Sequence, residues 1–464
     1  MMAQESADVV VIGAGPAGMT AATTAAQAGL SVVLLDEQEA AGGQIYRSVT
    51  RTDATRLNLL GPDYAAGKNI ASALTASNAR HETGAQVWQV TEDRTVHYIQ
   101  GGRSKSLAAR HVVLATGAME RPFPIPGWTL PGVMTAGAAQ ILLKASGTVP
   151  HQPVVLAGCG PLLYLLAWQY LRAGVAIRAV VETNTVADNW RAARHLPHAL
   201  RAWPELMKGL RLLRALRSAR VPVYGGAKDL RIEGEQAAAA ISFTVKGDHH
   251  RIDAELILLH QGVVPNTQIT WSLQASHCWD TVQLCWVPKR SGVFELDVPD
   301  IFVAGDGGGI AGAQAAVKQG EICALEILRR RDKIAKSAFD ERVAKARAQL
   351  SAYLRIRPFL DALYRPSDVN RIPADDVLVC RCEEVTAGEI RRSVAIGCVG
   401  PNQIKSFNRC GMGPCQGRLC GLTVTEIIAH ERRVSPEETG YYRIRPPIKP
   451  ITLGQLAGIQ HEDD

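Results

Sequence analysis

The 464-residue sequence has no long apolar run free of charges and no charged leader before an apolar stretch. The nearest candidate for a membrane span, residues 154–171, is interrupted by Gly158, Gly160 and Pro161, so we expect a strand, a turn and a helix there. These absences predict a cytoplasmic protein without a transmembrane segment. Aromatic residues make up only 5% of the chain, and the net charge of +7 forms no basic stripe interleaved with aromatics, which argues against nucleic-acid binding.

Cysteine is scarce in the first 379 residues. Cys159, Cys278, Cys285 and Cys323 are scattered singly there, and each is expected to be a small buried apolar residue. The other six of the ten cysteines all fall within residues 380–420. In a reducing cytoplasm, such clustering favours metal ligands or redox groups over structural disulfides.

The front of the chain carries a complete dinucleotide-binding pattern over residues 7–37. An apolar strand leads into the GxGxxG glycines, Gly13, Gly15 and Gly18, and a helix then leads to a second strand that ends at Asp36. The first glycine allows a tight turn, the second lets the backbone approach a pyrophosphate, and the third lets the helix pack against the strand. The helix N-terminus offers N–H groups to phosphates, and the acid accepts hydrogen bonds from a ribose.

Three later segments make this pattern resemble the flavoproteins with two dinucleotide-binding domains, the thioredoxin-reductase-like and glutathione-reductase-like group. They are GGQIYR at 42–47, a strand that ends at 115–117, and a strand that ends at Gly305 and Asp306 before a glycine-rich turn. The resemblance covers residues 7–330 and implies that Asp306 hydrogen-bonds the ribityl chain of FAD. The FAD-binding residues that it implies are Gly13, Gly15, Pro16, Ala17, Gly18, Asp36, Glu37, Gly42, Gly43, Gln44, Val87, Ala115, Thr116, Gly117, Gly305, Asp306 and Gln314.

Residues 153–183 repeat the strand, turn and helix of the first site with two departures. Leu163 stands where the third glycine is expected, and the spacing of the first acid reaches Val181, with Glu182 next to it. The pattern still predicts a Rossmann domain. In the resembling family this domain binds NAD(P)H, but here the sequence leaves open nicotinamide, another nucleotide or a scaffold role. The Arg- and Leu-rich stretch 190–220 predicts amphipathic helices at a surface or an interface.

The disulfide reductases of that family carry a CxxC or Cx4C pair near the flavin. No such pair follows the GGQIYR segment, and none lies between residues 130 and 150. Electrons that reach this FAD therefore need another acceptor. The sequence also shows no set of His, Asp and Glu residues typical of general acid–base chemistry, so we expect no catalytic residues on this chain and a role in electron transfer.

The cysteine-rich segment supplies two pairs of thiols, Cys380 with Cys382 and, after 27 residues, Cys410 with Cys415. Four thiolates in two pairs can hold Zn²⁺ or an iron–sulfur cluster. A CxC pair with a glycine-rich Cx4C loop suits a [2Fe–2S] cluster, whereas zinc usually takes CxxC pairs; a structural zinc site is the alternative. Cys420 is expected to be a bystander or close neighbour of this site.

Over residues 376–430 the segment resembles the bacterioferritin-associated-ferredoxin-like domain, a small helical [2Fe–2S] module. Thr386 is expected to cap one of its helices, and Cys398 to lie in its core.

The expected fold is therefore α/β, with two Rossmann-like domains and a small helical C-terminal domain. Its expected parts are a discontinuous FAD-binding domain (1–150 and 262–330), a degenerate second Rossmann domain (151–261), a helical linker (331–375), and a [2Fe–2S] ferredoxin-like domain with a C-terminal tail (376–464).

Together with the segments 120–140 (ERPFPIPGWTLPGVMTAGAAQ) and 409–421 (RCGMGPCQGRLCG), this order resembles the A (alpha) subunits of opine oxidases, namely octopine and nopaline oxidase. It is also similar to the matching subunits of D-hydroxyproline dehydrogenase, proline dehydrogenase complexes and hydrogen cyanide synthase. The resemblance implies a partner flavoprotein B (beta) subunit of D-amino-acid-oxidase type, which oxidises a C–N bond of an amino acid or opine. It also implies FMN at the subunit interface and a further small subunit in some members.

Two other functions stay open at this point. One is a stand-alone NADH-dependent reductase that passes electrons from FAD to the cluster, against which Leu163 and Val181 count. The other is an interaction module whose tail is a docking domain stabilised by zinc.

Overall fold

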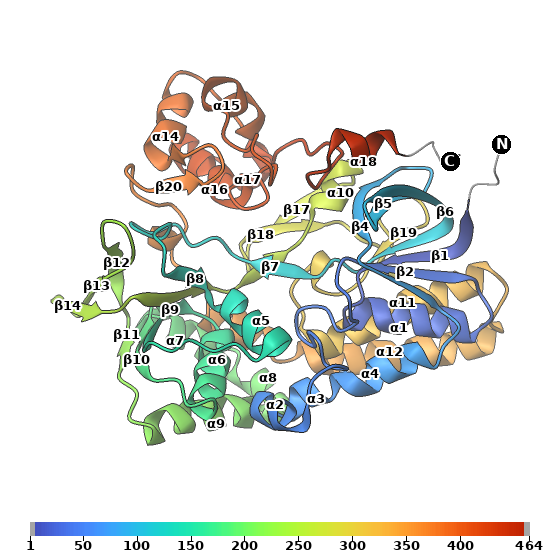
Figure 1. Ribbon diagram of the computed structural model, residues 1–464, viewed down its shortest axis with the longest axis horizontal. Helices are drawn as coiled ribbons and strands as arrows, with labels where there is room; N and C mark the ends of the chain where they lie inside the picture. The colour runs from blue at the N-terminus through green and yellow to red at the C-terminus, as the bar shows by residue number, and fades with distance from the viewer. Residues whose placement is uncertain (1–4, 459–464) are drawn as a thin grey trace.

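Two sheets of mostly parallel strands lie side by side, and a small helical domain sits against their upper edge (Figure 1). The structure is a computed structural model that describes residues 5–458. The outermost parts of the first and last expected domains, residues 1–4 and 459–464, lie outside the described residues. Among the described helices, none combines the length and apolar character needed to cross a membrane.

The first sheet has the strand order β3-β2-β1-β6-β5-β4, with β19 also paired to β6. Continuous runs of buried Val, Ile and Leu form β1, β2 and the end of β6, as parallel strands covered on both faces require. In the chain, β19 comes after all strands of the second sheet, yet it pairs with β6 of the first sheet. The first sheet is therefore built from two separate stretches of the chain. The strands are β1 (Ser6–Ile12), β2 (Val32–Asp36), β3 (Arg80–Thr83), β4 (Gln86–Val90), β5 (Thr95–Gln100), β6 (Arg103–Leu114) and β19 (Ile301–Val303).

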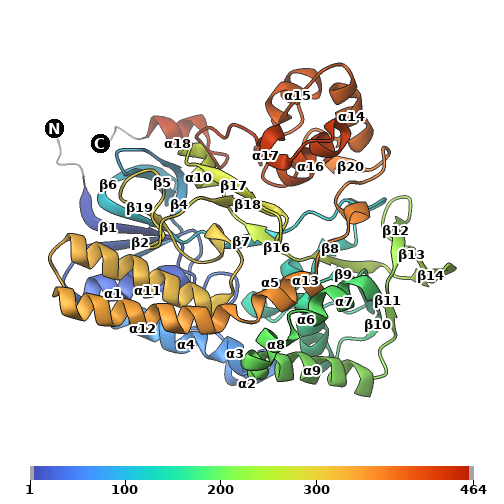
Figure 2. The ribbon, with the colours of Figure 1, turned by 180° about the vertical axis from the view of Figure 1, so that it is seen from behind.

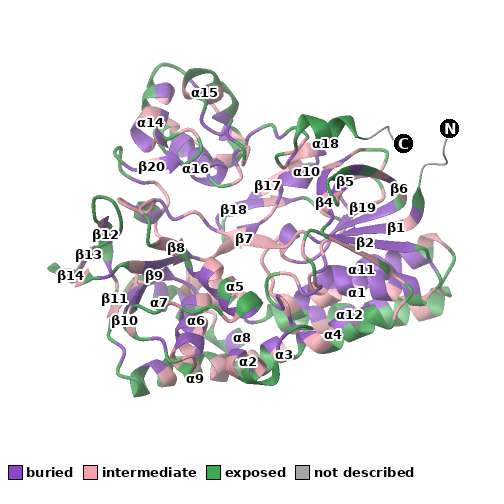
Figure 3. Ribbon diagram, in the orientation of Figure 1, coloured by how far each residue is buried: buried purple, intermediate pink, exposed green. Residues whose placement is uncertain are grey.

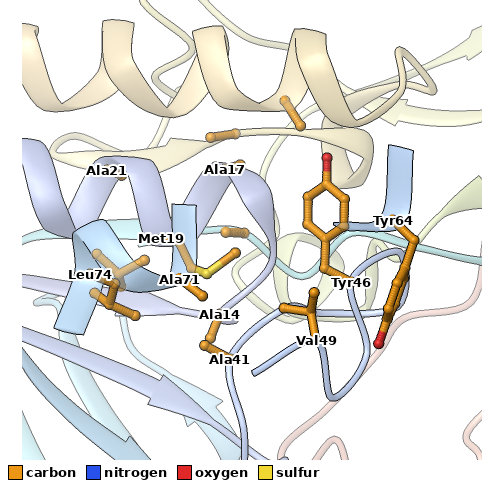
Figure 4. Close-up of a cluster of buried hydrophobic side chains, with 14 of the residues drawn as sticks. Ala14, Ala17, Met19, Ala21, Ala41, Tyr46, Val49, Tyr64, Ala71 and Leu74 are labelled. Carbon is orange, nitrogen blue, oxygen red and sulfur yellow. The ribbon is translucent and has the colours of Figure 1, made fainter. Parts of the chain in front are cut away.

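Small side chains let two helices approach closely beneath this sheet. α1 (Pro16–Gln27) packs against α11 (Ala313–Arg330), and α12 (Lys336–Leu354) covers α11 from outside (Figures 1 and 2). A Cβ on Gly320 of α11 would lie 2.2 Å from the carbonyl oxygen of Ala17. The alanines of α1 form one buried cluster with Met19 and with Tyr46 and Tyr64, which lie between β2 and β3 in the chain (Figure 4).

The second sheet is parallel throughout and has the order β11-β10-β9-β15-β8. The Rossmann pattern predicted for this half is present, and Leu163 is fully buried in its core. The strands and flanking helices are β8 (Val133–Thr135), α5 (Ala136–Ser146), β9 (Val154–Cys159), α6 (Pro161–Arg172), β10 (Ile177–Glu182), β11 (Val223–Gly225) and β15 (Leu256–Gln261). A separate antiparallel sheet consists of β12 (Lys228–Glu233), β13 (Ala240–Val245) and β14 (Asp248–Asp253).

Amphipathic helices follow β10, as the sequence predicts. They are α7 (Val186–Ala193), α8 (Leu196–Ala199), the 3-10 turn η1 (Leu200–Ala202) and α9 (Trp203–Ser218). The segment expected as a helical linker adds α13 (Arg357–Leu363), which packs against α7 and α8. Figure 2 shows α13 beside α6 and α7, so this segment also covers the second Rossmann domain.

The C-terminal domain is a short hairpin with four helices. Thr386 caps α14 with a capping box in which its hydroxyl accepts from the Glu389 amide and the Glu389 carboxylate accepts from the Thr386 amide, which confirms the predicted cap. Its elements are β20 (Leu378–Cys380), β21 (Val385–Thr386), α14 (Ala387–Ala395), α15 (Pro401–Asn408), α16 (Gly421–Arg432) and α17 (Pro436–Thr439). The chain then returns to the first sheet, where the Ile448 amide donates to the Trp88 carbonyl and Lys449 pairs with Glu37.

The single cysteines behave largely as predicted. Burial raises the pKa of Cys159, Cys285 and Cys323 to about 12, so these thiols are poor nucleophiles. Cys278 is only half-buried, and Cys398 lies in the hydrophobic core of the C-terminal domain as expected.

Candidate functional site

The first dinucleotide loop is built by backbone contacts that only glycine allows. Gly13 has a φ of +105°, and a Cβ there would lie 2.4 Å from the carbonyl oxygen of Ala115 at the end of β6. A Cβ on Gly18 would lie 1.8 Å from the carbonyl oxygen of Gly13, so α1 rests directly on the loop. A Cβ on Gly43 would lie 2.8 Å from the Cα of Gly15. The segment after β2 therefore closes over the loop, as a phosphate cradle requires.

Asp36 fixes this loop from the end of β2. Its buried carboxylate accepts from the amide of Ala14 at 2.5 Å and from the amide of Gln38 at 2.7 Å. Each carboxylate oxygen keeps a lone pair that can accept from a ribose hydroxyl. Glu37 instead pairs with Lys449 at the surface, and Val87 on β4 is buried.

The remaining predicted flavin residues meet at the ends of β6 and β19. The Thr116 hydroxyl donates to the Asn266 carbonyl at 3.0 Å, and a Cβ on Gly307 would lie 3.1 Å from that hydroxyl. Asp306 accepts from the amides of residues 311 and 312 at 2.8 and 2.9 Å, so it orders the turn into α11. Gln314 is exposed in the first turn of α11. The residues that the resemblance assigns to FAD thus line the carboxyl ends of neighbouring parallel strands, where α/β proteins bind cofactors.

Two buried cations beside this loop were not expected from the sequence. The Lys144 ammonium of α5 donates to the Gln44 carbonyl at 3.1 Å and to the Gln140 side chain at 2.8 Å, and burial together with the nearby Arg47 lowers its pKa to about 7. The Nε of Arg47 is buried without a hydrogen-bond partner in residues 5–458. Neither cation forms an ion pair within the described part of the chain, which suits an anionic cofactor at the loop.

In the second dinucleotide loop, the His260 ring lies against the second glycine, Gly160. A Cβ on Gly158 would lie 1.7 Å from the carbonyl oxygen of His260, and one on Gly160 would lie 2.8 Å from the His260 ring. His260 is held by a 2.6 Å contact between its Nδ1 and the Glu120 carboxylate. The remaining cavity of about 150 Å³ is bordered by Tyr364 and α13. That volume is smaller than the roughly 300–1,000 Å³ of typical small-molecule pockets.

The acid of this second site is also engaged. The hydroxyl of Tyr164 donates to the Glu182 carboxylate at 2.5 Å, and burial raises the pKa of Glu182. The Asn184 side chain donates to the Leu363 carbonyl at 3.1 Å, which ties the end of β10 to α13. The group nearest to the predicted ribose position therefore already has a protein partner.

Five of the six clustered cysteines form two adjoining groups. The sulfurs of Cys380, Cys410 and Cys420 lie within 4.8 Å of one another, and all three residues are buried. The exposed Cys382 and the half-buried Cys415 interact through their side chains beside this group. The structure therefore divides the four predicted ligands between two groups and places Cys420, which was expected to be a bystander or close neighbour, inside the tighter one.

Hydrogen bonds polarise the three buried thiols. Bonds with Cys410 and Cys420 lower the pKa of Cys380 to about 2. The bond with Cys380 raises the pKa of Cys410 to about 12 and that of Cys420 well above its ordinary value. Three thiols in mutual contact form a donor set that a thiophilic metal could occupy by displacing protons.

Tyr442 closes the cysteine site from one side, a role that no sequence pattern indicated. Its buried ring lies against Gly411 and Gly417, where Cβ atoms would come within 2.4 Å of the ring. Its hydroxyl is buried next to the Cys410 thiol, and burial followed by the nearby Cys420 raises its pKa. A hydroxyl beside the thiols fits a cluster whose sulfurs accept hydrogen bonds.

A short segment joins the two sites. Its Asn266 accepts from Thr116 and donates its amide to the Gly117 carbonyl at 3.0 Å. Two residues later, the Gln268 side chain donates to the carbonyl of Cys415 at 3.5 Å. The rings of Trp271 and Tyr441 stack across the same boundary with centroids 5.0 Å apart. The segment thus contacts the flavin-type turn at one end and the cysteine loop at the other.

Gly18→Ala should deplete the protein of flavin. The new methyl would overlap the Gly13 carbonyl, and overpacking of this kind costs roughly 1–3 kcal/mol. Flavin absorbance per protein after purification measures the effect. Gly209→Ala, on α9 where a Cβ meets nothing within 4 Å, is the control. Equal flavin content in both variants would contradict the proposed role of this loop.

Cys420→Ser should lose most of its iron, because it removes one of three mutually contacting thiols. Cys398→Ser alters a buried cysteine of the same domain outside the group and should keep its iron. Iron and sulfide content per chain, measured after anaerobic purification, gives the comparison. Full iron content in Cys420→Ser would instead support the four ligands predicted from the sequence.

Comparisons with known proteins agree with this architecture. Residues 7–320 match the model of the pyridine nucleotide-disulphide oxidoreductase family, and residues 376–459 match the sarcosine oxidase A3 domain. The chain is 45% identical to the A (alpha) subunit of opine oxidase from Rhizobium meliloti, over 99% of this chain and 88% of that protein. It is 31% identical to the HcnB subunit of hydrogen cyanide synthase from Pseudomonas aeruginosa, over 98% and 99% of the two chains.

Among solved structures, the L-proline dehydrogenase from P. horikoshii matches with a TM-score of 0.71 and 18% identity, over 98% of this chain and 81% of that one. That likeness confirms the fold of the flavoprotein part. The 45% identity over nearly the whole chain confirms the resemblance drawn from the motifs: this chain belongs to the family of opine oxidase A (alpha) subunits, whose members are components of flavoprotein oxidoreductases.

Proposed function

We propose that this chain is the electron-transfer subunit of a heteromeric opine oxidase and carries FAD and a [2Fe–2S] cluster. A separate flavoprotein subunit of D-amino-acid-oxidase type would oxidise octopine or nopaline and release an amino acid and a 2-oxo acid. The observation that carries the proposal is the contact between the flavin-type turn at Thr116 and the cysteine loop at Cys415 through one short segment.

The residues of each site suit these cofactors. The glycine loop and Asp36 would hold the pyrophosphate and ribose of FAD, and the cations Arg47 and Lys144 would offset its negative charge. The proposed cluster ligands come from five thiols: Cys380, Cys382, Cys410 and Cys415, which the sequence predicts, and Cys420, which lies in the tighter group with Cys380 and Cys410. When bound, FAD accepts electrons in pairs or singly and an iron–sulfur cluster carries them one at a time.

The second Rossmann domain supports a scaffold role over nicotinamide binding. The His260 ring lies against the glycine loop, Glu182 is engaged by Tyr164, and α13 borders the cavity that is left. These contacts weigh against the stand-alone NADH-dependent reductase. They also agree with an enzyme whose electrons come from another subunit.

The same chain could serve a D-hydroxyproline or proline dehydrogenase, or a hydrogen cyanide synthase. The likeness to L-proline dehydrogenase and to HcnB favours this second candidate, while the higher identity to the A (alpha) subunit of opine oxidase favours the first.

FMN at the subunit interface and a further small subunit belong to this proposal too. A cytoplasmic location also belongs to this proposal.

Co-purification with a co-expressed flavoprotein subunit of D-amino-acid-oxidase type tests the function. Octopine or nopaline should reduce the complex, with bleaching of both flavin and iron–sulfur absorbance, whereas this chain alone should not respond. Proline and D-hydroxyproline serve as competing substrates. Oxidation of an amino acid by this chain alone, or failure of any flavoprotein subunit to bind it, would contradict the proposal.

NADH should leave the flavin of the isolated chain oxidised under anaerobic conditions, because the His260 ring lies against the second dinucleotide loop. Absorbance of the bound flavin is followed after addition of NADH or NADPH. Dithionite, which needs no binding site, is the positive control for a reducible flavin. Bleaching by either nucleotide would restore the reductase hypothesis.

A further inference from the structure

Large apolar side chains are exposed on the helices that come after β10. These helices contain no residue of either candidate site. The side chains of Val186 and Trp190 on α7 are 71% and 73% exposed, and Trp203 on α9 is 65% exposed. Val186 and Trp190 are four residues apart and therefore share one face of their helix. Trp is a residue that folded proteins rarely leave open to water, so such a surface marks an interaction site.

The surface extends over neighbouring elements. Leu196, Leu200 and Leu210 are also exposed large apolar residues between α8 and α9, and Trp203 and Leu210, seven residues apart, lie on the same face of α9. In Figure 1 α9 runs along the lower edge of the molecule, opposite the small helical domain, and α7 lies above it beside α6. In Figure 3 exposed residues predominate along α9.

Nearly all of the protein's net positive charge lies on the same stretch. Residues 186–220 contain eight Lys and Arg against two acids, Asp188 and Glu205, which gives 8 − 2 = +6 of the total +7. The seven arginines are all exposed, and Arg191 alone of them forms a salt bridge within the described residues. This stretch therefore combines exposed large apolar side chains with arginines, six of which form no salt bridge within the described residues.

We infer that this surface, which we call the α7–α9 face, is the docking site of the substrate-oxidising flavoprotein subunit, whose matching face would be apolar at its centre and acidic at its rim. This inference rests on the proposed function and names the place of its subunit contact. Exposed Trp together with Arg is the composition of protein–protein hot spots.

Charge and composition favour this occupant over two others. In a symmetric contact between two copies of this chain, residues 186–220 with a net charge of +6 would face the same residues of the other copy. Repulsion between these like charges opposes such a contact. An anionic membrane attracts Lys and Arg alike, whereas protein interfaces enrich Arg and deplete Lys. The stretch has seven Arg and one Lys, and that Lys208 already pairs with Asp63.

One ion pair joins the face to the flavoprotein half of the chain. The pair between Lys208 and Asp63 joins α9 to α3 (Pro62–Ala65), in the part of the chain that follows the predicted flavin segment 42–47. The exposed Cys382 belongs to the helical domain at the opposite edge of the molecule (Figure 1). Docking at the α7–α9 face leaves that thiol site free for an electron acceptor.

The double variant Trp190→Ser/Trp203→Ser tests the inference in the full chain against the co-expressed flavoprotein subunit. Loss of two hot-spot side chains should weaken the affinity between the subunits by at least about 30-fold. Phe407→Ser, which removes a 62% exposed aromatic residue from α15, should leave this affinity within about twofold. Flavin content and far-UV circular dichroism verify that each variant folds.

Charge reversal gives an independent measurement. Arg211→Glu/Arg214→Glu/Arg217→Glu should slow the association of the two subunits about tenfold at low salt and reduce its salt dependence. In the wild-type complex, amide hydrogen exchange over residues 186–217 should slow relative to the free chain, a result that needs no variant.

Wild-type affinity in the tryptophan variant, or no protection of 186–217, overturns the docking site while the proposed function stands. Binding of the wild type to vesicles with anionic phosphatidylglycerol, lost in the tryptophan variant while its affinity for the flavoprotein subunit is kept, assigns the face to a membrane instead. If the wild type forms a homodimer that the tryptophan variant loses while it still binds the flavoprotein subunit, the α7–α9 face is assigned to a second copy of this chain. Complete failure of the wild type to bind the flavoprotein subunit overturns the proposed function as well.

Discussion

The hydrogen bonds of one short segment hold the two candidate redox sites in a fixed relation. Asn266 bonds the backbone and hydroxyl at Thr116 and Gly117, and Gln268 reaches the carbonyl of Cys415. The flavin-type turn and the cysteine loop are thus tied through largely backbone groups, which have little conformational freedom once their strands have formed. Other contacts also join the helical domain to the rest of the chain: the Trp128 indole donates to the Leu378 carbonyl at 2.8 Å, and the Trp279 amide donates to the Glu437 carboxylate at 3.2 Å. An electron-transfer role depends on this coupling.

The second Rossmann domain shows how a fold can outlast the site that it usually carries. Its parallel sheet and glycine turn are intact, and Leu163 is absorbed into the core. The space above the turn is taken by His260, Tyr364 and α13, which come from later parts of the chain. What remains to this domain is its outer surface, which bears the exposed tryptophans and nearly all of the net charge. Under the proposed function, this domain serves as a scaffold and a contact surface rather than as a nicotinamide site.

Local patterns were predictable from the sequence, and long-range contacts were not. The GxGxxG turn with Asp36 and the cap at Thr386 each depend on a few neighbouring residues, so spacing alone predicted their geometry. Cys420 joins the tight thiol group because the start of α16 folds back onto the β20 hairpin. The spacing of the cysteines in the sequence does not predict this contact. The buried Lys144 and the cover provided by α13 likewise depend on contacts between segments about a hundred residues or more apart.

An electron-transfer role requires that one chain hold both a flavin and an iron–sulfur cluster. The decisive measurement is the iron, sulfide, zinc and flavin content of the anaerobically purified chain, together with the electron paramagnetic resonance spectrum of the reduced protein. We predict one flavin with iron and sulfide in the amounts of a two-iron cluster, and a signal from the reduced cluster. Stoichiometric zinc without iron or sulfide would contradict this prediction and would assign the cysteine-rich domain a structural role.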